Sequence, residues 1–351
     1  MTAPRVELAP GYSVSRVIHG TWQLSAGHRE RGVDRRAAVD GLLRLAEAGF
    51  TTFDSADIYT GAEELLGELV RAWRRLGGDR PRPDLQIHTK LVPDRSALAR
   101  VDRSYLETVV DRSLRRLGVE RLDLVQLHWW DYAVPGWVEA AGVLDDLRRA
   151  GKVRLVGATN FDVAHLVEIL DAGVPVASHQ VQYSVVDRRP EHGMAALARE
   201  RGVALLAYGA LAGGFLTERW LGAGAPAGEL ANRSLTKYRL ILEEMGPWSL
   251  FQELLAVLAA IGARRGVAPA TVALAWTLAR PGVTAAIVGA TGDRHLEATV
   301  RAADLKLEAE ELEALDRVVA RGRGPEGDTY ALERVPGGAH AAVMRYDLNR
   351  A

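Results

Sequence analysis

The stretch GFTTFDSADIY, residues 49–59, decides how the rest of the chain is interpreted. Its apolar run at residues 50–53 predicts a short buried strand that ends at Asp54. The loop after that strand carries Tyr59, and a new helical pattern of apolar residues follows. Parallel α/β proteins place their functional side chains at the carboxyl ends of the strands. A carboxylate and a phenol at such a position therefore predict a functional site, provided that other strands supply partners.

The composition is that of a globular protein with a substantial core, with 48% hydrophobic and 25% charged residues among 351. The net charge of −1 gives no basic field for nucleic acid or a membrane surface, so neither partner is expected. The chain has no cysteine, which excludes disulfides and thiolate metal ligands, and we expect no metal site. The N-terminal residues lack the apolar core of a signal peptide, and no run approaches about 18 apolar residues, so a cytoplasmic location is expected.

Strand and helix patterns alternate from residue 17 to about residue 305. Apolar runs predict eight strands, at residues 17–20, 51–54, 85–89, 122–127, 153–157, 176–181, 203–207 and 284–288. Helical spacing predicts helices between them, at residues 34–48, 104–117, 142–150, 163–170, 194–201 and 270–279. Strands separated by helices pair in parallel through right-handed crossovers, and eight such repeats close most economically into a (β/α)8 TIM barrel.

The alternative fold is a doubly wound open sheet. That fold would carry a glycine-rich dinucleotide fingerprint after its first strand, and the sequence GTWQ at residues 20–23 is not one. No linker or low-complexity segment divides the chain. We therefore predict a single domain over residues 1–351, with the barrel at about 17–305 and a C-terminal extension at about 306–351.

Three additions to the barrel are predicted. Alternating apolar and polar residues around Pro10 and Gly11 indicate an N-terminal β-hairpin. A long loop with a helical segment of its own, residues 217–266, follows the seventh strand. A C-terminal helix at residues 308–319 precedes a glycine-rich tail at residues 322–351. The last two additions could cover either a mouth or a side of the barrel.

Four polar side chains follow three consecutive predicted strands. Asp54 and Tyr59 follow the second strand, Lys90 follows the third and His128 follows the fourth. Each has a structural explanation when taken alone: Asp54 as a helix cap, Tyr59 as a packing residue and His128 as a hydrogen-bonded core histidine. Lys90 is harder to explain in this way, because an ammonium at the end of a buried strand needs a carboxylate partner, and Asp54 is well placed to be one. Their joint occurrence on one rim favours a catalytic site.

These residue types suit proton transfer to a carbonyl oxygen. A tyrosine, with a pKa of roughly 10, is a weak acid near neutrality. A neighbouring lysine would stabilise the phenolate and lower that pKa, an aspartate would hold the lysine, and a histidine could hydrogen-bond a substrate oxygen. The pattern offers no metal cluster and no serine or cysteine nucleophile. A hydride donor would have to come from outside, which points to a nicotinamide.

Two motifs resemble signatures of the aldo-keto reductase family. The stretch at residues 49–59 resembles the first signature, and RLGVERLDLVQLH at residues 116–128 resembles the second. The resemblance covers about residues 15–305. It implies that Asp54, Tyr59, Lys90 and His128 form the catalytic tetrad of that family, with Tyr59 as the general acid and base.

The resemblance also implies a nicotinamide site on the same rim. The implied cofactor-binding residues are Thr21, Trp22, Asp54, Thr159, Asn160, Gln180, Tyr208, Leu211, Gly213, Arg219, Gly289, Thr291, Arg294 and His295. Among them, Thr159 and Asn160 stand where the family holds the carboxamide, and Tyr208 stands where an aromatic ring stacks on the nicotinamide. Structural alternatives exist here as well: Gln180 could only pair inside the barrel, and Gly213 could only form a turn.

The match weakens after the eighth strand. Ala298 and Thr299 replace a Glu-Asn pair that often reads the adenine in the family. Gly292 stands where a lysine or arginine often contacts the 2′-phosphate, although Arg294 or His295 could substitute. NADPH is therefore expected in preference to NADH.

The expected activity is NAD(P)H-dependent reduction of an aldehyde or ketone to an alcohol, with the proton from Tyr59. The alternatives are a nicotinamide-binding regulatory or subunit protein with little turnover and, in third place, a barrel lyase without redox chemistry. The substrate is expected to be a small carbonyl compound, bound by Trp22, Tyr59, His128, Trp129 and Trp130. An aromatic wall of this kind suits apolar carbonyls and also sugar faces.

Other aromatic residues could complete or close this pocket. They are Trp220 in the long loop and Tyr330, His340 and Tyr346 in the tail. Neither the substrate itself nor the oligomeric state can be predicted from these patterns.

Overall fold

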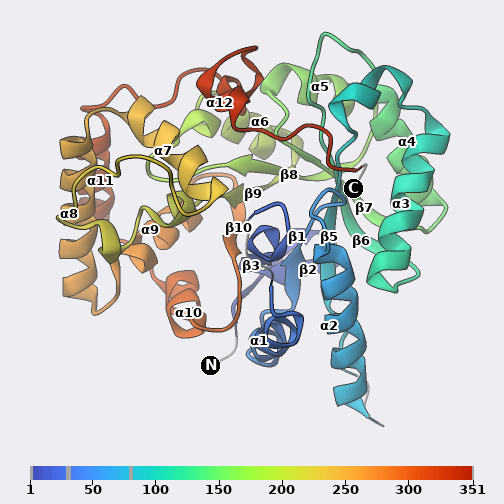
Figure 1. The fold of residues 1–351 in the computed structure, drawn as a ribbon, viewed down its shortest axis with the longest axis horizontal. Coiled ribbons are helices and arrows are strands. Elements are labelled where there is room, and N and C mark those ends of the chain that lie inside the picture. Colours follow the sequence, from blue (N-terminus) through green and yellow to red (C-terminus); the bar gives the residue numbers. More distant parts are fainter. Residues whose placement is uncertain (1–2, 29–32, 79–81, 350–351) are drawn as a thin grey trace.

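The computed structural model describes residues 3–28, 33–78 and 82–349, and in this part of the chain eight parallel strands close into a barrel (Figure 1). The barrel strands are β3 (Val17–Gly20), β4 (Thr52–Asp54), β5 (Gln86–Leu91), β6 (Leu122–Leu127), β7 (Val153–Thr159), β8 (Val176–Gln182), β9 (Ala204–Tyr208) and β10 (Val283–Gly289). The prediction of a TIM barrel is confirmed. The strand ends differ from the prediction by at most two residues, and Lys90 lies within β5 rather than after it.

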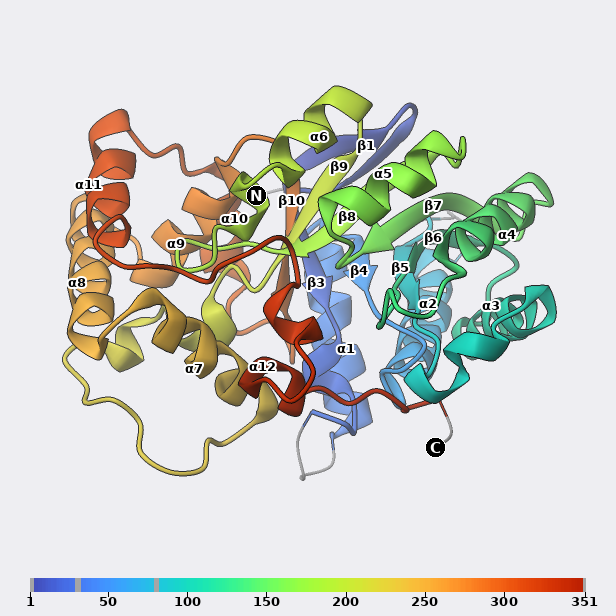
Figure 2. The same cartoon turned by 90° about the horizontal axis from the view of Figure 1, so that it is seen from above.

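Helices surround the barrel on its outside (Figure 2). Those that alternate with the barrel strands are α1 (Arg35–Glu47), α2 (Ala62–Gly77), α3 (Arg103–Leu117), α4 (Trp137–Arg149), α5 (Val163–Asp171), α6 (Met194–Arg201), α9 (Pro269–Leu278) and α10 (Leu296–Asp304). Three of them begin at a capping aspartate, Asp34, Asp102 or Asp162, whose carboxylate accepts a hydrogen bond from a backbone N–H in the first turn. Helix α4 begins at Trp137, five residues before the predicted start, because its first turn adds half-buried apolar residues to the expected pattern.

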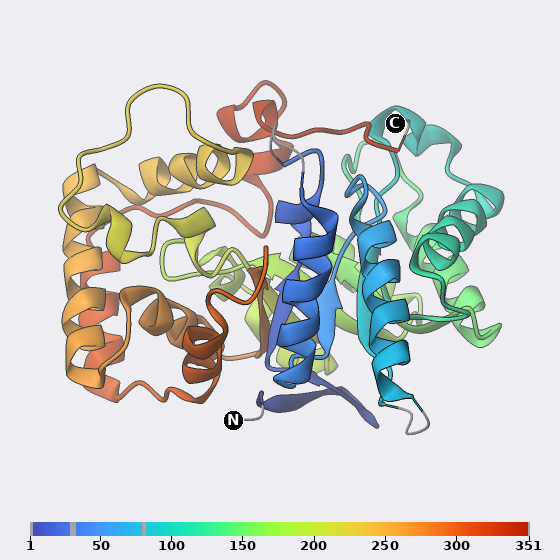
Figure 3. The ribbon, with the colours of Figure 1, turned by 60° about the horizontal axis from the view of Figure 1, so that its bottom comes forward.

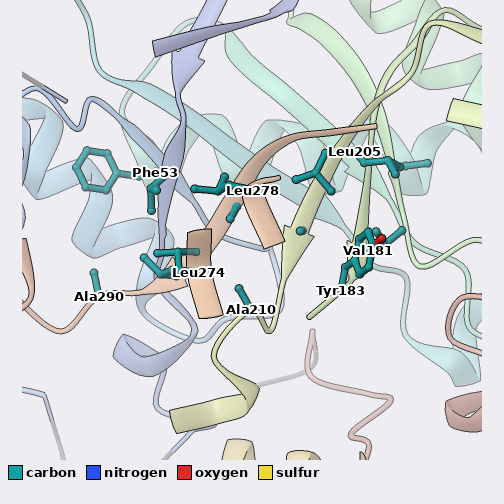
Figure 4. Close-up of a cluster of buried hydrophobic side chains, with 14 of the residues drawn as sticks. Phe53, Val181, Tyr183, Leu205, Ala210, Leu274, Leu278 and Ala290 are labelled. Carbon is teal, nitrogen blue, oxygen red and sulfur yellow. The ribbon is translucent and has the colours of Figure 1, made fainter. Parts of the chain in front are cut away.

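Each barrel strand alternates side chains between the barrel interior and the helix layer, as strand geometry requires. The outward residues join the core between strands and helices, which contains Leu205 of β9 together with Leu274 and Leu278 of α9 (Figure 4). At the N-terminal end of the barrel, an apolar cluster that includes Ile18 and Leu206 lies beside a hydrogen bond from Thr52 Oγ1 to Gln86 Oε1 at 2.9 Å.

The predicted N-terminal hairpin closes the apolar end of the barrel. Its strands are β1 (Arg5–Ala9) and β2 (Tyr12–Ser15), which pair antiparallel and lie at the bottom in Figure 3. Leu8, Tyr12 and Val14 pack on the inward apolar residues of the barrel strands. Since this end is sealed, ligands can reach the barrel interior only from the other end.

The insertion and the tail cover different parts of the barrel. The insertion contains α7 (Arg233–Met245) and α8 (Trp248–Arg265), and α8 packs on α9 and on the C-terminal helix α11 (Ala309–Val319) at the barrel's side (Figure 1). The tail runs across the carboxyl end through a 3-10 turn, Leu332–Arg334, and α12 (Ala339–Ala342) (Figure 3). Helix α12 contacts α7, so these two segments meet over the mouth.

Across the described ranges, no single helix is both long and apolar enough to cross a membrane. The pair α7 and α8, bent by 101°, passes the same criterion only when the two helices are taken together.

Candidate active site

The carboxyl ends of β4 and β5 bring Asp54 and Lys90 together. Lys90 Nζ donates hydrogen bonds to Asp54 Oδ2 at 2.5 Å and to the backbone oxygen of Ser55 at 2.7 Å. Only 7% of the Lys90 side chain and 4% of the Asp54 side chain are exposed. Burial alone would lower the pKa of Lys90, but the neighbouring Asp54 and Tyr59 outweigh it and raise that pKa, so the lysine is an ammonium. The expected ion pair is present.

Asp54 is held in place from a second direction. Its Oδ1 accepts hydrogen bonds from Gln126 Nε2 at 3.1 Å and from Gln180 Nε2 at 2.8 Å. Gln180 Nε2 also lies 3.0 Å from Gln126 Oε1, and Thr21 Oγ1 donates to the Asp54 backbone oxygen at 3.0 Å. The carboxylate is thus fixed by three strands. Gln126 was missing from the predicted site, although it stands two residues before His128 on the same inward face.

Tyr59 lies beside this pair. The Lys90 Nζ atom is 5.1 Å from the centre of the Tyr59 ring, and the ring of Trp22 lies 5.0 Å away on a tilted plane. Burial raises the pKa of Tyr59 above its ordinary value, and the opposing attraction of Lys90 is smaller. The pKa of Tyr59 is therefore raised, whereas the sequence predicted that Lys90 would lower it. The phenol of this buried site stays protonated at neutral pH, which is the form that a proton donor needs.

His128 approaches the same site from the end of β6. Its Nδ1 donates to the backbone oxygen of Thr159 at 3.2 Å, and a carbonyl oxygen can only accept. The buried Nε2 has no partner among the described residues and therefore presents a lone pair. Burial, assisted by Arg334, lowers the pKa of His128 to about 3, so the ring is neutral at physiological pH.

The predicted nicotinamide-contacting residues also converge at this end of the barrel. Tyr208 of β9 donates its hydroxyl hydrogen bond to Asn160 Oδ1 at 2.9 Å. Asn160 follows β7 with a left-handed backbone, at φ 62°. Thr159 Oγ1 donates to the Gln180 backbone oxygen at 3.2 Å. Strands β7, β8 and β9 thereby place an aromatic ring and a row of amide and hydroxyl groups beside the tetrad.

The loop after β9 is packed tightly under α7. A Cβ atom at Gly213 would lie 2.7 Å from Tyr238 Cδ2, and at Gly209 it would lie 2.3 Å from the Tyr238 hydroxyl. Both glycines have positive φ, so no other residue fits either position without strain. Half-buried Leu211 lies between them.

The remaining predicted cofactor residues are more dispersed. Thr291, Arg294 and His295 are exposed around the start of α10. Gly289, at the end of β10, faces the side chain of Gln23. Arg219 is exposed in the insertion, 5.4 Å from the centre of the Trp220 ring.

Thr299 and Trp220 make contacts within the protein that account for their positions without a ligand. The hydroxyl of Thr299 donates to the His295 backbone oxygen within its own helix. Trp220 packs with Phe215 and Trp248. It therefore anchors the insertion rather than lining the rim.

The two tryptophans after His128 have different surroundings. Trp130 contacts the His128 ring edge to face, with ring centres 4.3 Å apart. Trp129 is fully buried, and its Nε1 donates to the Val134 backbone oxygen at 2.8 Å. This places Trp129 in the core between strands and helices, away from the substrate surface to which it was assigned.

The tail reaches the site with two of its aromatic residues. Tyr330 lies 5.5 Å from the His128 ring and Tyr346 lies 5.0 Å from the Trp130 ring. His340 instead contacts Glu244 of α7 at 3.2 Å. The tail thus forms part of the wall around the tetrad.

A buried ionic cluster fixes the tail to the barrel and was not predicted. Arg189 pairs with Asp187 at 2.7 Å and with Glu333 of the tail at 2.8 Å, and each of these side chains is at most 1% exposed. Lys237 of α7 lies 3.8 Å from Glu333 and 5.2 Å from the centre of the Tyr208 ring. Lys237 is one of only four lysines among 44 basic residues, which was the one available sign of a special position.

The fold and the site define a barrel protein with a Tyr, Lys, Asp and His tetrad on its open rim. The sequence model of the aldo/keto reductase family matches residues 16–320. The chain belongs to the aldo/keto reductase family, as its two signature motifs predicted.

Similar proteins cover most of the chain. It is 28% identical over 332 residues to the NADH-specific methylglyoxal reductase of Escherichia coli strain K12, covering 87% of this chain and 97% of that protein. It is 30% identical over 287 residues to an aldo-keto reductase of Strobilurus tenacellus, covering 81% of each. Among solved structures, a thermostable aldo-keto reductase in complex with the inhibitor epalrestat has a TM-score of 0.70 at 26% identity, covering 91% of this chain and 100% of the other.

Proposed function

We propose that this protein is an NAD(P)H-dependent oxidoreductase that reduces an aldehyde or ketone to an alcohol. The observation that carries the proposal is the buried ion pair of Lys90 and Asp54 beside the protonated phenol of Tyr59. Membership of the aldo/keto reductase family and the methylglyoxal reductase activity named for the Escherichia coli relative support it.

Tyr59 supplies the proton in this proposal. Negative charge develops on the carbonyl oxygen during reduction, and the phenol donates its proton to that oxygen. The Lys90 ammonium then stabilises the phenolate that remains, and Asp54 keeps the ammonium charged and oriented. Gln126 and Gln180 prevent the carboxylate from turning away.

His128 orients the reacting oxygen. Because its Nε2 carries a lone pair, it can accept a hydrogen bond from a hydroxyl but cannot donate one to a bare carbonyl. It therefore holds the hydroxyl of the alcohol, whereas Tyr59 is the donor to the carbonyl oxygen. In the direction of alcohol oxidation, that hydroxyl would turn its single proton from His128 to a Tyr59 phenolate.

A nicotinamide cofactor supplies the hydride when bound, and the residues present fit such a group. Tyr208 offers a flat ring fixed by its hydrogen bond to Asn160, and amide groups of Asn160 and Gln180 lie on the same side of the barrel. The exposed Arg294 at the start of α10 is a cation suited to a 2′-phosphate, so we propose NADPH as the preferred form. The Escherichia coli relative is NADH-specific, which makes this preference a separate question.

The cofactor preference is tested by Arg294→Ala. Loss of a charge-assisted contact should weaken NADPH binding roughly 10-fold and change NADH binding much less. Quenching of tryptophan fluorescence gives both dissociation constants. A wild-type protein that binds NADH more tightly than NADPH would overturn the preference and leave the reductase proposal intact.

The reaction is tested with a panel of aldehydes and ketones in the presence of NADPH or NADH, followed at the nicotinamide absorbance. Replacing Tyr59 by Phe should lower the rate of the chemical step at least ~10²-fold while cofactor binding persists, because only the acidic proton is lost. Near-wild-type turnover in that variant would refute the role of Tyr59. Tight cofactor binding without turnover of any carbonyl would favour the regulatory or subunit alternative.

A further inference from the structure

A cavity of about 470 Å³ lies over the carboxyl end of the barrel, between the tail and the segment that follows β6. Its aromatic lining consists of Trp130, Tyr132 and Tyr346, and its charged lining includes Arg334 of the tail. Trp130 separates this cavity from the site described above, because the same ring contacts His128 at 4.3 Å. The cavity is therefore one aromatic ring away from the proton-transfer machinery.

Among the charged residues of this lining that the structure describes, Arg334 is the one without an ion pair. The other ionised residues there are paired: Arg95 lies 3.0 Å from Asp131, and Glu333 lies 2.8 Å from Arg189. Within the described residues, Arg334 forms no ion pair. Its charge reaches His128, whose pKa it lowers as the largest influence after burial.

The Arg334 guanidinium is also rigid and incompletely hydrogen-bonded. Its Nη2 donates to the Trp129 backbone oxygen at 2.8 Å and its Nη1 to the Tyr330 backbone oxygen at 3.5 Å. Its Cζ atom lies 4.2 Å from the Tyr132 ring centre and 5.1 Å from that of Tyr330. Its Nε is buried and has no acceptor among the described residues. A fixed guanidinium with unused donors on the wall of an aromatic cavity is suited to a planar anion.

We propose that Arg334 is a substrate-specificity residue that binds the carboxylate of an oxo-acid substrate. This inference rests on the proposed reductase function. The body of the substrate passes the edge of the Trp130 ring, so that its carboxylate stays in the cavity and its carbonyl reaches Tyr59 and His128. Because Arg334 and His128 each lie more than 5 Å from the centre of the Tyr330 ring, at 5.1 Å and 5.5 Å, we place the carboxylate several bonds away from the carbonyl. A carboxylate fits better than a phosphate dianion, since Asp131 and Glu333 would repel the second charge.

The test compares 4-carboxybenzaldehyde with its neutral isostere 4-formylbenzamide. The wild-type protein should have a kcat/KM roughly 10-fold or more higher for the acid, since an anion that meets a guanidinium gains an interaction that the amide lacks. Arg334→Met should remove that preference, so that kcat/KM for the acid and for the amide differ from each other by less than about threefold. Arg334→Lys should keep a reduced preference, because it keeps the charge and loses the planar fork.

Arg345→Met is the matched control. Arg345 is an exposed arginine of the same tail that does not line the cavity, so its replacement should leave the preference unchanged. Equal kcat/KM for acid and amide in the wild-type protein, or an acid preference that survives in Arg334→Met, would overturn the proposal. If thermal unfolding shows that Arg334→Met does not fold, Arg334→Lys is the test. A reduced preference for the acid in that variant would support the proposal, and an unchanged preference would overturn it.

A binding measurement separates this proposal from the proposed function. Tryptophan fluorescence can report binding of 4-(hydroxymethyl)benzoate and of its amide, because Trp130 lines the cavity. Binding of the benzoate that depends on Arg334, without reduction of any aldehyde, would uphold the anion site and refute the reductase function. Reduction of both aldehydes without any dependence on Arg334 would uphold the reductase function and refute the anion site.

Discussion

The buried pair of Lys90 and Asp54 predicts a strong energetic coupling that unfolding experiments can measure. Removing one partner of a buried ion pair leaves the other charge unpaired and typically costs about 3–5 kcal/mol. Here Gln126 and Gln180 still solvate the Asp54 carboxylate, so Lys90→Met should cost about 3 kcal/mol, at the lower end of that range. Asp54→Asn should cost a similar amount, because it leaves a buried ammonium. The double variant removes both charges and should be no less stable than either single variant.

The coupling free energy of the pair should then be about 3 kcal/mol, measured by urea unfolding of the wild type, both single variants and the double variant. The exposed pair of Arg35 and Glu68 is the control. Its atoms are also 2.7 Å apart, but its side chains are 44% and 40% exposed, and its coupling should stay below about 1 kcal/mol. Additive effects of Lys90→Met and Asp54→Asn would refute the argument that burial makes the two charges interdependent.

Two further predictions concern protonation. Burial raises the pKa of Asp57 to about 8, so the folded state binds the carboxyl proton more tightly than the unfolded state does. The stabilisation from this proton is complete below about pH 4. It is lost as the pH rises from there through about 8, at up to about 1.4 kcal/mol per pH unit. The stability of Asp57→Asn relative to the wild type should therefore rise between pH 5 and pH 9, and a constant difference in thermal unfolding would contradict this. For His128, whose pKa is lowered to about 3, kcat/KM should show no histidine titration between pH 5 and pH 8; an inflection near pH 6.5 that disappears in His128→Gln would contradict it.

The tetrad was predictable because strand geometry is regular. Side chains alternate along a strand, and parallel strands end on one rim, so a lysine and a carboxylate at two strand ends had to meet. The same alternation, continued past the end of β6, separates Trp129 from Trp130. The outward face that holds Leu127 also holds Trp129, and the inward face that holds His128 leads to Trp130. Treating the two tryptophans as one wall ignored this rule.

The contacts of the tail were not predictable in this way. Glu333 pairs with Arg189, 144 residues earlier, and neither residue belongs to a periodic pattern. A glycine-rich segment carries no strand or helix signal that would fix where its side chains point. The direction of the Tyr59 pKa shift was not predictable either. It depends on how far burial outweighs the attraction of Lys90, and the amino-acid sequence does not show how deeply Tyr59 is buried.

The proposed function assigns proton transfer and substrate selection to different parts of the chain. Strands β4 and β5 supply Asp54 and Lys90, and the loop after β4 supplies Tyr59 beside them. The tail supplies Tyr330, whose ring contacts His128, and Arg334, whose charge lowers the pKa of His128. Substitutions in the tail should consequently change which carbonyl is accepted more than they change the ion pair of Asp54 and Lys90. Because the charge of Arg334 also acts on His128, that one residue links the choice of substrate to the group that orients the reacting oxygen.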